Sequence, residues 1–127
     1  MKLDDPRLRV DPAGGLARDA VAAGDRVYAV IRGVSTNNDG RGDGPMAPVL
    51  TGQIEVIQHA WERSGVDPSD VGYVETHGTG TAVGDVTEFS GLMQSIGQHA
   101  QSAALGSSKA NVGHTMSAAG VAGLIRT

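Results

Sequence analysis

The chain has 127 residues, of which 39% are hydrophobic, 19% charged and 3% aromatic, with a formal net charge of −4 and no cysteine. This length fits one domain with a core of Val, Ile, Leu and Ala, and the missing cysteines exclude disulfides, thiolate metal sites and a thiol nucleophile in this chain. It has no basic run, signal peptide or apolar stretch of membrane-spanning length, so we expect a cytoplasmic chain that binds neither nucleic acid nor membrane.

The opening of the chain shows no regular period. Residues 1–15 hold two prolines and two glycines and predict a loose leader. A short helix is expected over about 16–23, because Gly24 supplies a stop. Residues 26–36, RVYAVIRGVST, are rich in β-branched and apolar side chains and predict a largely buried strand. The Asn, Asp, Gly and Pro of residues 37–48 predict a surface loop.

Helix and strand patterns alternate through the rest of the chain. The predicted elements are a helix over 51–64 that Thr51 caps and Gly65 ends, a turn over 67–70, a strand over 71–77, a helix with one face at Phe89, Leu92, Met93 and Ile96 that Gly97 ends, and a short strand over 103–108. This alternation favours an α/β layer structure in which helices cover a sheet.

The last segment, residues 113–127, is apolar nearly all the way round, which predicts a helix that Gly113 opens and that is buried on every side. It carries no capping glycine and no polar tail. A chain of this length offers little surface to bury such a helix, so we expect it to belong to a larger protein.

Three titratable side chains follow predicted strands. His77 and Lys109 stand where strands end, and His114 follows five residues after Lys109. Ligands of α/β sheets bind beyond the carboxyl ends of strands, so these side chains are expected to meet at one edge. Glycines near His77 let the backbone approach a ligand, and Thr79 and Thr81 offer uncharged hydroxyls. Two neutral imidazoles on one oxygen would form an oxyanion site, and the Lys109 charge would discourage their protonation.

Structural roles compete with this interpretation for every histidine. A single histidine is more often structural than catalytic, and His59 and His99 lie on predicted helices or their ends. A metal site is a second alternative, although the chain lacks a close HxxxH or HxxH pair. The residues that could form a zinc site are His77, His114, Glu75 and Asp85.

Other loop motifs give weaker signals. The glycines within 78–84 depart from the GxGxxG pattern of dinucleotide loops. Residues 37–44 resemble a calcium loop until its twelfth position, where Pro48 stands in place of Glu. The adhesion tripeptide at 41–43 is a chance match, and the GxSxG pattern of serine hydrolases is absent.

Three stretches together carry a family resemblance: GDRVYAVIRGVSTNNDGRGDGPMAP, VETHGTGTAVGDVTE and GSSKANVGHTMSAAGVAGLI. They resemble, in order and at plausible spacing, the second half of a β-ketoacyl synthase (ketosynthase) domain of type I polyketide synthases. The resemblance covers about residues 16–127. It implies a thiolase-like layered α/β/α half-domain, with a mixed sheet covered by helices, from an acyltransferase that condenses acyl and malonyl-type thioesters by decarboxylating Claisen chemistry.

The resemblance also assigns site residues. His77 would match the first catalytic histidine of the family and His114 the second, both donating hydrogen bonds to the malonyl thioester carbonyl as the carboxylate leaves. Lys109 would match the lysine that tunes and orients this pair. Glu88 would be the partner of Lys109 through a water molecule.

Carrier and partner expectations follow from the same resemblance. Thr79 and Thr81 would match the threonines that bind the amides of a phosphopantetheine arm. That arm belongs to an acyl carrier protein, so no cofactor is expected to bind directly. The expected partners are the carrier protein and acyl and malonyl-type thioesters, with homodimerisation in the full-length protein.

The chain also departs from the family pattern. The acyl-accepting cysteine of the first half is absent, as is the closing segment with its gating loop, and Met116 and Ser117 stand where many members have Glu or Gln and Ala. We therefore expect the full-length protein to catalyse condensation and this chain alone to be inactive. The alternatives are a non-catalytic ketosynthase-like partner or carrier-protein-binding half-domain and, with less support, a nucleotide-binding domain.

Overall fold

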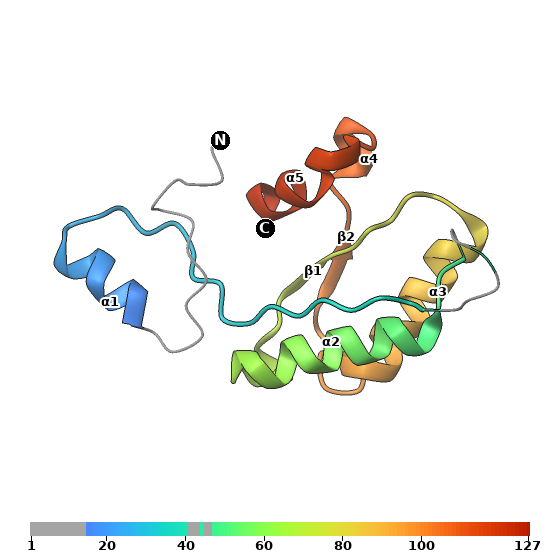
Figure 1. The fold of residues 1–127 in the computed structure, drawn as a ribbon, viewed down its shortest axis with the longest axis horizontal. Helices are drawn as coiled ribbons and strands as arrows, with labels where there is room; N and C mark the ends of the chain where they lie inside the picture. Colours follow the sequence, from blue (N-terminus) through green and yellow to red (C-terminus); the bar gives the residue numbers. More distant parts are fainter. Residues whose placement is uncertain (1–14, 41–43, 45–46) are drawn as a thin grey trace.

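The computed structural model describes residues 15–40, 44 and 47–127 (Figure 1). The helices are α1 (Gly15–Ala22), α2 (Leu50–Ser64), α3 (Ala82–Leu92), α4 (Lys109–Val112) and α5 (Ala119–Arg126), and the strands are β1 (Tyr73–Glu75) and β2 (Ala104–Gly106). The predicted leader lies outside the described residues except for Gly15, which begins α1. The tripeptide at 41–43, within the predicted loop, lies outside them as well.

A parallel strand pair separates two groups of helices. β1 and β2 pair in parallel, with Val74 opposite Leu105. Figure 1 shows α2 and α3 on one side of the strands and α4 and α5 on the other, with α1 at the far end of the molecule. The predicted layered α/β arrangement is therefore present. Within the described residues the sheet has only these two parallel strands, so the antiparallel strand of the expected mixed sheet is not among them.

The predicted boundaries of α2 were half right. Gly65 ends the helix in a left-handed conformation, with φ 62°, as its lack of a Cβ allows. Thr51, however, is not the N-cap. The helix begins one residue earlier, at Leu50, so Thr51 already lies in the first turn and Val49 takes the cap position without a side-chain hydrogen bond.

The buried strand predicted over 26–36 is wrong. Only Ile31 makes an isolated bridge, and no ladder forms along this segment. The later part of the segment instead runs alongside α2 (Figure 1), where the Arg63 guanidinium donates a hydrogen bond to the Val34 carbonyl at 3.1 Å. β-branched side chains favour extended backbone, but a strand also needs a neighbour with which to share hydrogen bonds. In the described residues β1 and β2 pair only with each other.

The long helix predicted over 113–127 is also wrong in its start and its burial. Gly113 ends α4, with φ 72° and ψ −178°, rather than opening the last helix. A 3₁₀ turn at Met116–Ala118 follows, and only then does α5 begin. The Ile125 side chain is 71% exposed, because no described element covers that face of α5.

The buried core is small and lies under α3. Leu92 and Ile96, at 9% and 7% exposed, are its buried hydrophobic residues, whereas Phe89 and Met93 of the same predicted face are exposed. α3 ends at Leu92 and continues as a π-helical turn to Gly97, both packed against α2. No helix in the described part of the chain is long and apolar enough to cross a membrane.

Candidate functional site

The two strands deliver their downstream residues to the same end of the sheet. Both the amide and the hydroxyl of Thr76 donate hydrogen bonds to the Gly106 carbonyl, at 2.7 Å and 3.0 Å. The pairing of the strands therefore continues to the residue before His77. His77 thus sits just beyond the carboxyl end of β1, where an α/β sheet places its ligands.

The structure brings His77 and His114 together. Their ring centroids lie 5.4 Å apart and the ring planes meet at 90°. His77 comes from the loop after β1 and His114 from the loop after α4, so residues 37 positions apart in the sequence share one site. The two rings are therefore close together at one edge of the sheet, as the sequence predicts.

The backbone after His114 sets the proton position on its imidazole. The amide of Met116 donates a hydrogen bond to His114 Nδ1 at 3.0 Å. A neutral imidazole whose Nδ1 accepts must carry its proton on Nε2, which leaves Nε2–H as a donor. Met116 has φ 51°, a left-handed conformation that is uncommon for a residue with a side chain. The sequence carries no signal for this role, because every residue except proline has a backbone amide.

Glu88 fixes the backbone that carries His77. Its Oε1 accepts the His77 amide at 2.6 Å and its Oε2 accepts the Gly78 amide at 3.0 Å. A carboxylate that accepts two backbone N–H groups holds the start of the loop against α3. The resemblance implies that a water molecule also links Glu88 to Lys109, and this link stays a prediction.

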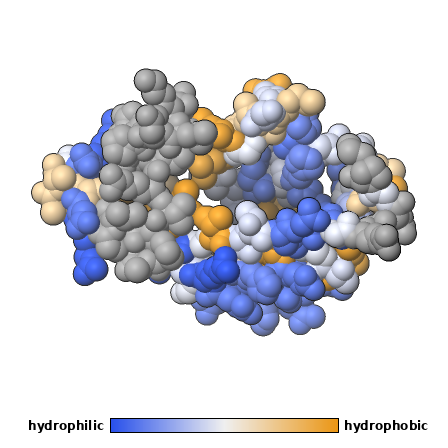
Figure 2. All heavy atoms as spheres, in the orientation of Figure 1, coloured by the Kyte–Doolittle hydropathy of each residue, from blue (hydrophilic) through white to orange (hydrophobic). Residues whose placement is uncertain are grey.

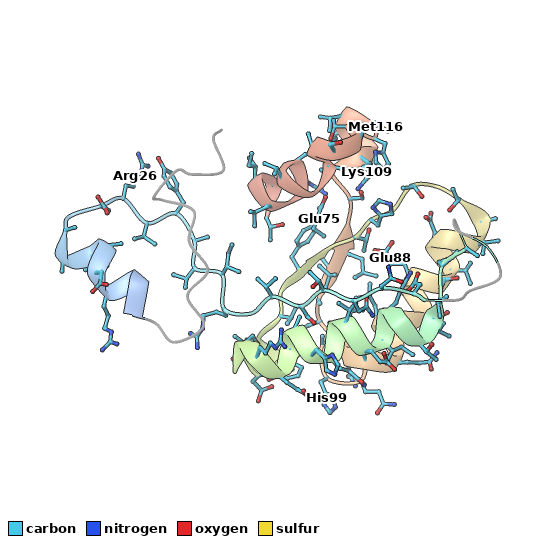
Figure 3. The ribbon with its side chains drawn as sticks, viewed as in Figure 1. Arg26, Glu75, Glu88, His99, Lys109 and Met116 are labelled. Carbon is cyan, nitrogen blue, oxygen red and sulfur yellow. The ribbon has the colours of Figure 1, made fainter. Side chains whose placement is uncertain are left out.

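Lys109 begins α4, directly after the turn that follows β2. It is half-buried, and its amide donates to the Ser107 hydroxyl at 3.3 Å. Figure 3 places Lys109 at α4 and His99 beyond α2, on the opposite side of the molecule. His99 and His59 are both exposed, the latter on α2, as their structural interpretation implies.

Thr79 and Thr81 lie on the exposed loop between His77 and α3. Their hydroxyl oxygens are 3.5 Å apart, and Thr81 is the N-cap residue of α3. The loop is folded back by the Gly80 amide, which donates to Asp85 Oδ1 at 3.2 Å. Both hydroxyls therefore stand on the same short loop as His77.

One cavity of about 1640 Å³ connects these side chains with an apolar wall. Among its lining residues are His77, His114, Thr79, Thr81 and Glu88, with Val56, Ile57 and Trp61 from α2. Figure 2 shows this face of the molecule hollowed between α2 and the α4–α5 pair, with hydrophobic side chains beside the hollow. Lys109 is not among the lining residues, so the structure brings the two histidines to the cavity without the lysine.

A second polar cluster lies beneath the histidines. Glu75 accepts hydrogen bonds from the Tyr73 hydroxyl and the Ser108 amide, and pairs with Arg126 at 3.0 Å. These contacts, the Tyr73 hydroxyl first and the Ser108 amide second, lower the pKa of Glu75 to about 2. The same carboxylate raises the pKa of the Tyr73 phenol. From the sequence alone, Glu75 is predicted only as a possible zinc ligand.

The described residues contain no group of three or more His, Asp or Glu side chains arranged to hold a metal ion. Glu75, one of the four candidate zinc ligands, uses its carboxylate for the contacts above. The calcium-like loop over 37–44 includes residues 41–43 and so lies partly outside the described chain.

Solved structures share this fold. The chain superposes with a TM-score of 0.82 on a ketosynthase from module 1 of the bacillaene synthase of Bacillus amyloliquefaciens, at 46% identity, covering 87% of this chain and 20% of that one. An oxazolomycin ketosynthase domain from Streptomyces albus gives a TM-score of 0.82 at 39% identity, covering 87% and 30%. The fold is therefore the thiolase-like layered α/β fold, as the sequence predicted.

The sequence places the chain in a family. Residues 28–127 match the family described as β-ketoacyl synthase, C-terminal domain. A phenolphthiocerol/phthiocerol polyketide synthase of Mycobacterium tuberculosis is 47% identical over 108 residues, and a mycocerosic acid synthase-like polyketide synthase of Mycolicibacterium smegmatis is 51% identical over 108 residues. The chain belongs to the β-ketoacyl synthase family, whose members are condensing, acyl-transferring enzymes.

The chain is short beside these relatives. It aligns over 85% of its own length, but spans only 7% of the M. tuberculosis synthase and 5% of the M. smegmatis one. The activity of those large proteins as a whole is therefore only proposed for this chain.

Proposed function

We propose that this chain supplies the decarboxylation site of a β-ketoacyl synthase in polyketide or fatty acid synthesis. In this proposal His77 and His114 donate hydrogen bonds to the thioester carbonyl oxygen of a malonyl-type unit. The observation that carries the proposal is the edge-to-face approach of the two rings, 5.4 Å between centroids, at the wall of one cavity. The Met116 amide supports it, because it leaves His114 Nε2–H free to donate.

The chemistry needs two donors at one oxygen. When the carbon–carboxylate bond of the malonyl unit breaks, carbon dioxide leaves and the electron pair moves into the thioester to form an enolate. Donors already aimed at the enolate oxygen stabilise this charge without reorganising, which is the largest single contribution in many enzymes. The enolate carbon then attacks the carbonyl of an acyl thioester, and the thiolate leaves as the new carbon–carbon bond forms.

The other site residues are assigned supporting roles. Lys109, through its charge, orients and tunes the imidazole pair, and Glu88 holds the loop that carries His77. Thr79 and Thr81 bind the amides of the phosphopantetheine arm of an acyl carrier protein, the partner that presents the malonyl unit. No directly bound cofactor is needed, and the full-length protein is proposed to act as a homodimer.

The acyl chain must be held by a nucleophile outside this polypeptide. The chain has no cysteine, so the acyl-accepting thiolate has to come from a second part of the enzyme. Incubation of the purified chain with a radiolabelled acyl thioester should leave it unlabelled. Covalent labelling of the chain would contradict this part of the proposal.

Complementation tests the proposed function directly. The chain is mixed with a cysteine-bearing amino-terminal half of a ketosynthase, malonyl carrier protein and an acyl thioester, and β-ketoacyl product and carbon dioxide are measured. His77→Ala and His114→Ala should each abolish both products, whereas His99→Ala, an exposed histidine far from the site, should leave them unchanged. Full activity in His77→Ala would overturn the assignment.

A second candidate is a non-catalytic ketosynthase-like partner that binds a complementary chain or a carrier protein. The exposed apolar side chains on α5 favour it, because Leu124 and Ile125 lack a covering element among the described residues. In that case the chain should co-purify with the cysteine-bearing half, and His77→Ala should affect neither binding nor turnover. Loss of turnover with binding retained would favour the catalytic candidate.

A further inference from the structure

We propose that Glu75 is a positioning residue that holds together the two loops bearing His77 and His114. The carboxylate lies between β1, the turn after β2, and α5, so it contacts three of the segments whose relative placement sets the distance between the imidazoles. Like His77 and His114 it lines the cavity, but both of its carboxylate oxygens accept hydrogen bonds from these segments. The consequence for condensation rests on the proposed function, but the positioning role concerns geometry and can be tested without turnover.

The contacts of Glu75 join three separate segments. Oε1 accepts the amide of Ser108, one residue before α4 and six residues before His114. Oε2 accepts the Tyr73 hydroxyl from its own strand and the Arg126 guanidinium at 3.0 Å from the end of α5. Arg126 also donates to the Tyr73 hydroxyl at 2.6 Å. Glu75 itself lies two residues before His77, so the carboxylate links the backbone near one histidine to the backbone near the other.

Two glycines leave the space that this cluster occupies. A Cβ at Gly123 on α5 would lie 3.0 Å from Glu75 Cγ, and a Cβ at Gly106 would lie 2.6 Å from the Tyr73 hydroxyl oxygen. Neither glycine has a left-handed φ, so backbone conformation does not require glycine at either position. The close approach of the cluster does. A side chain at either position would therefore force Glu75 or Tyr73 to shift from the cluster.

The Tyr73, Glu75 and Arg126 cluster should contribute more to stability than an ordinary surface ion pair. Exposed pairs contribute little, because water screens the charges and two flexible side chains must be ordered. Here the Glu75 side chain is 13% exposed, and it accepts a backbone amide as well as a hydroxyl and a guanidinium. Figure 3 shows Glu75 between the strands and the α4–α5 pair. The Tyr73 hydroxyl and the Ser108 amide keep the pKa of Glu75 low, so the carboxylate is ionised throughout the neutral range.

Glu75→Gln tests the proposal in the intact 127-residue chain. Imidazole rings 5.4 Å apart should give ring-to-ring NOE cross-peaks in the NMR spectrum of the unaltered chain. The variant keeps the side-chain shape but loses the charge that holds Arg126 and one of the two oxygens that accept the Tyr73 hydroxyl and the Ser108 amide. The expected result is loss of these cross-peaks from an otherwise folded spectrum. Retention at full intensity in folded Glu75→Gln would overturn the proposal.

Asp67→Asn is the matched control. Asp67 also accepts one backbone amide and one hydroxyl, both from Ser69, and these bonds lower its pKa, but it caps the Pro68–Asp70 turn before β1. This variant should keep the cross-peaks. Loss in both variants would mean that any removed carboxylate loosens the chain, and would refute a specific role for Glu75.

Tyr73→Phe covers the case in which Glu75→Gln does not fold. It removes one hydroxyl and keeps the carboxylate, so the cross-peaks should weaken while the fold remains. In the complemented enzyme, Tyr73→Phe should lower kcat, by up to about 100-fold for a displacement near 1 Å, with KM for the malonyl carrier unchanged. Unchanged cross-peaks together with unchanged kcat would refute the proposal. If the unaltered enzyme shows no condensation, the proposed function fails while the NMR result still decides the positioning role.

Discussion

Gly78→Ala probes the close approach between the loop after β1 and the turn after β2. Gly78 has φ +44°, and an added Cβ would lie 2.9 Å from both Ser107 Cβ and Thr76 Oγ1. The substitution therefore combines an unfavourable backbone conformation with a steric clash. Since Gly78 directly follows His77, both effects act on the backbone that positions the first imidazole.

The magnitude follows from these two terms. A left-handed conformation costs an L-residue about 1–2 kcal/mol. Carbon atoms in contact prefer a separation of about 3.5–4.0 Å, so the Ser107 turn must move away by roughly 0.6–1 Å, and overpacking of this kind costs about 1–3 kcal/mol. We expect Gly78→Ala to lower the free energy of unfolding by about 2–5 kcal/mol. In the complemented enzyme, a displacement near 1 Å should lower condensation about 100-fold.

Substitutions at two other glycines distinguish the cost of the backbone conformation from the cost of the steric clash, when urea unfolding of the purified chain is measured. Gly80 has φ +77° with nothing within 4 Å of an added Cβ, so Gly80→Ala should lose only the backbone term, about 1–2 kcal/mol. Gly72 has open space and no left-handed φ, so Gly72→Ala should change stability by no more than about 0.5 kcal/mol. Equal losses in Gly78→Ala and Gly80→Ala would refute the reasoning, because the clash would then contribute nothing.

Three further predictions concern the groups around the imidazoles. The pKa of Glu75 is lowered to about 2 from 4.5, so its contribution to stability is complete above the unfolded pKa and is lost as the pH falls through about 2. Between pH about 5 and about 2.5 the urea midpoint should therefore fall less in Glu75→Gln than in the unaltered chain. An identical fall in both would contradict this prediction. Met116→Pro removes the amide that binds His114 and also the left-handed φ of 51° that presents it, because proline fixes φ near about −65°, so the ¹⁵N shifts of that ring should show a mixture of tautomers. Met116→Gly keeps both features and should keep the Nε2–H form, and unchanged shifts in the proline variant would show that the amide does not set the tautomer. Glu88→Gln replaces one accepting oxygen by a donor and should lower the free energy of unfolding by about 1.5–3 kcal/mol in urea titration, and no loss would mean that the loop is held by other contacts.

Local signals in the sequence predicted much of the fold. Gly24 and Gly65 end their helices with positive φ, as glycines after apolar periodic segments should. The strands over 71–77 and 103–108 are present, although only three residues of each form the ladder. These features depend on residues that are close in the sequence, so the sequence alone is enough to predict them.

The failures share one physical cause. Residues 26–36 have the composition of a strand, yet strand formation is decided by a neighbouring strand, and in the described residues this segment forms no ladder beyond the isolated bridge at Ile31. Residues 113–127 have the composition of a buried helix, yet burial is decided by what covers it, and Ile125 remains exposed. The composition of a segment shows which backbone conformation it prefers. Whether a strand finds a partner and whether a helix is buried depend on other segments of the protein.

The same division applies to the site. The sequence placed His77 and His114 after strands of one α/β unit, because parallel strands send their carboxyl ends to the same edge. It could not show that the rings meet edge to face, that a backbone amide fixes one tautomer, or that Glu88 binds the loop backbone.

The order of strands, glycine stops and polar loops was thus determined by the sequence itself, since each depends on the intrinsic conformational preference of a few neighbouring residues. The meeting of two imidazoles, and the cluster of Tyr73, Glu75 and Arg126 beneath them, was decided only by the tertiary structure. Hydrogen bonds between residues 51 to 53 positions apart depend on how whole elements pack, and two glycines on different elements make that packing possible.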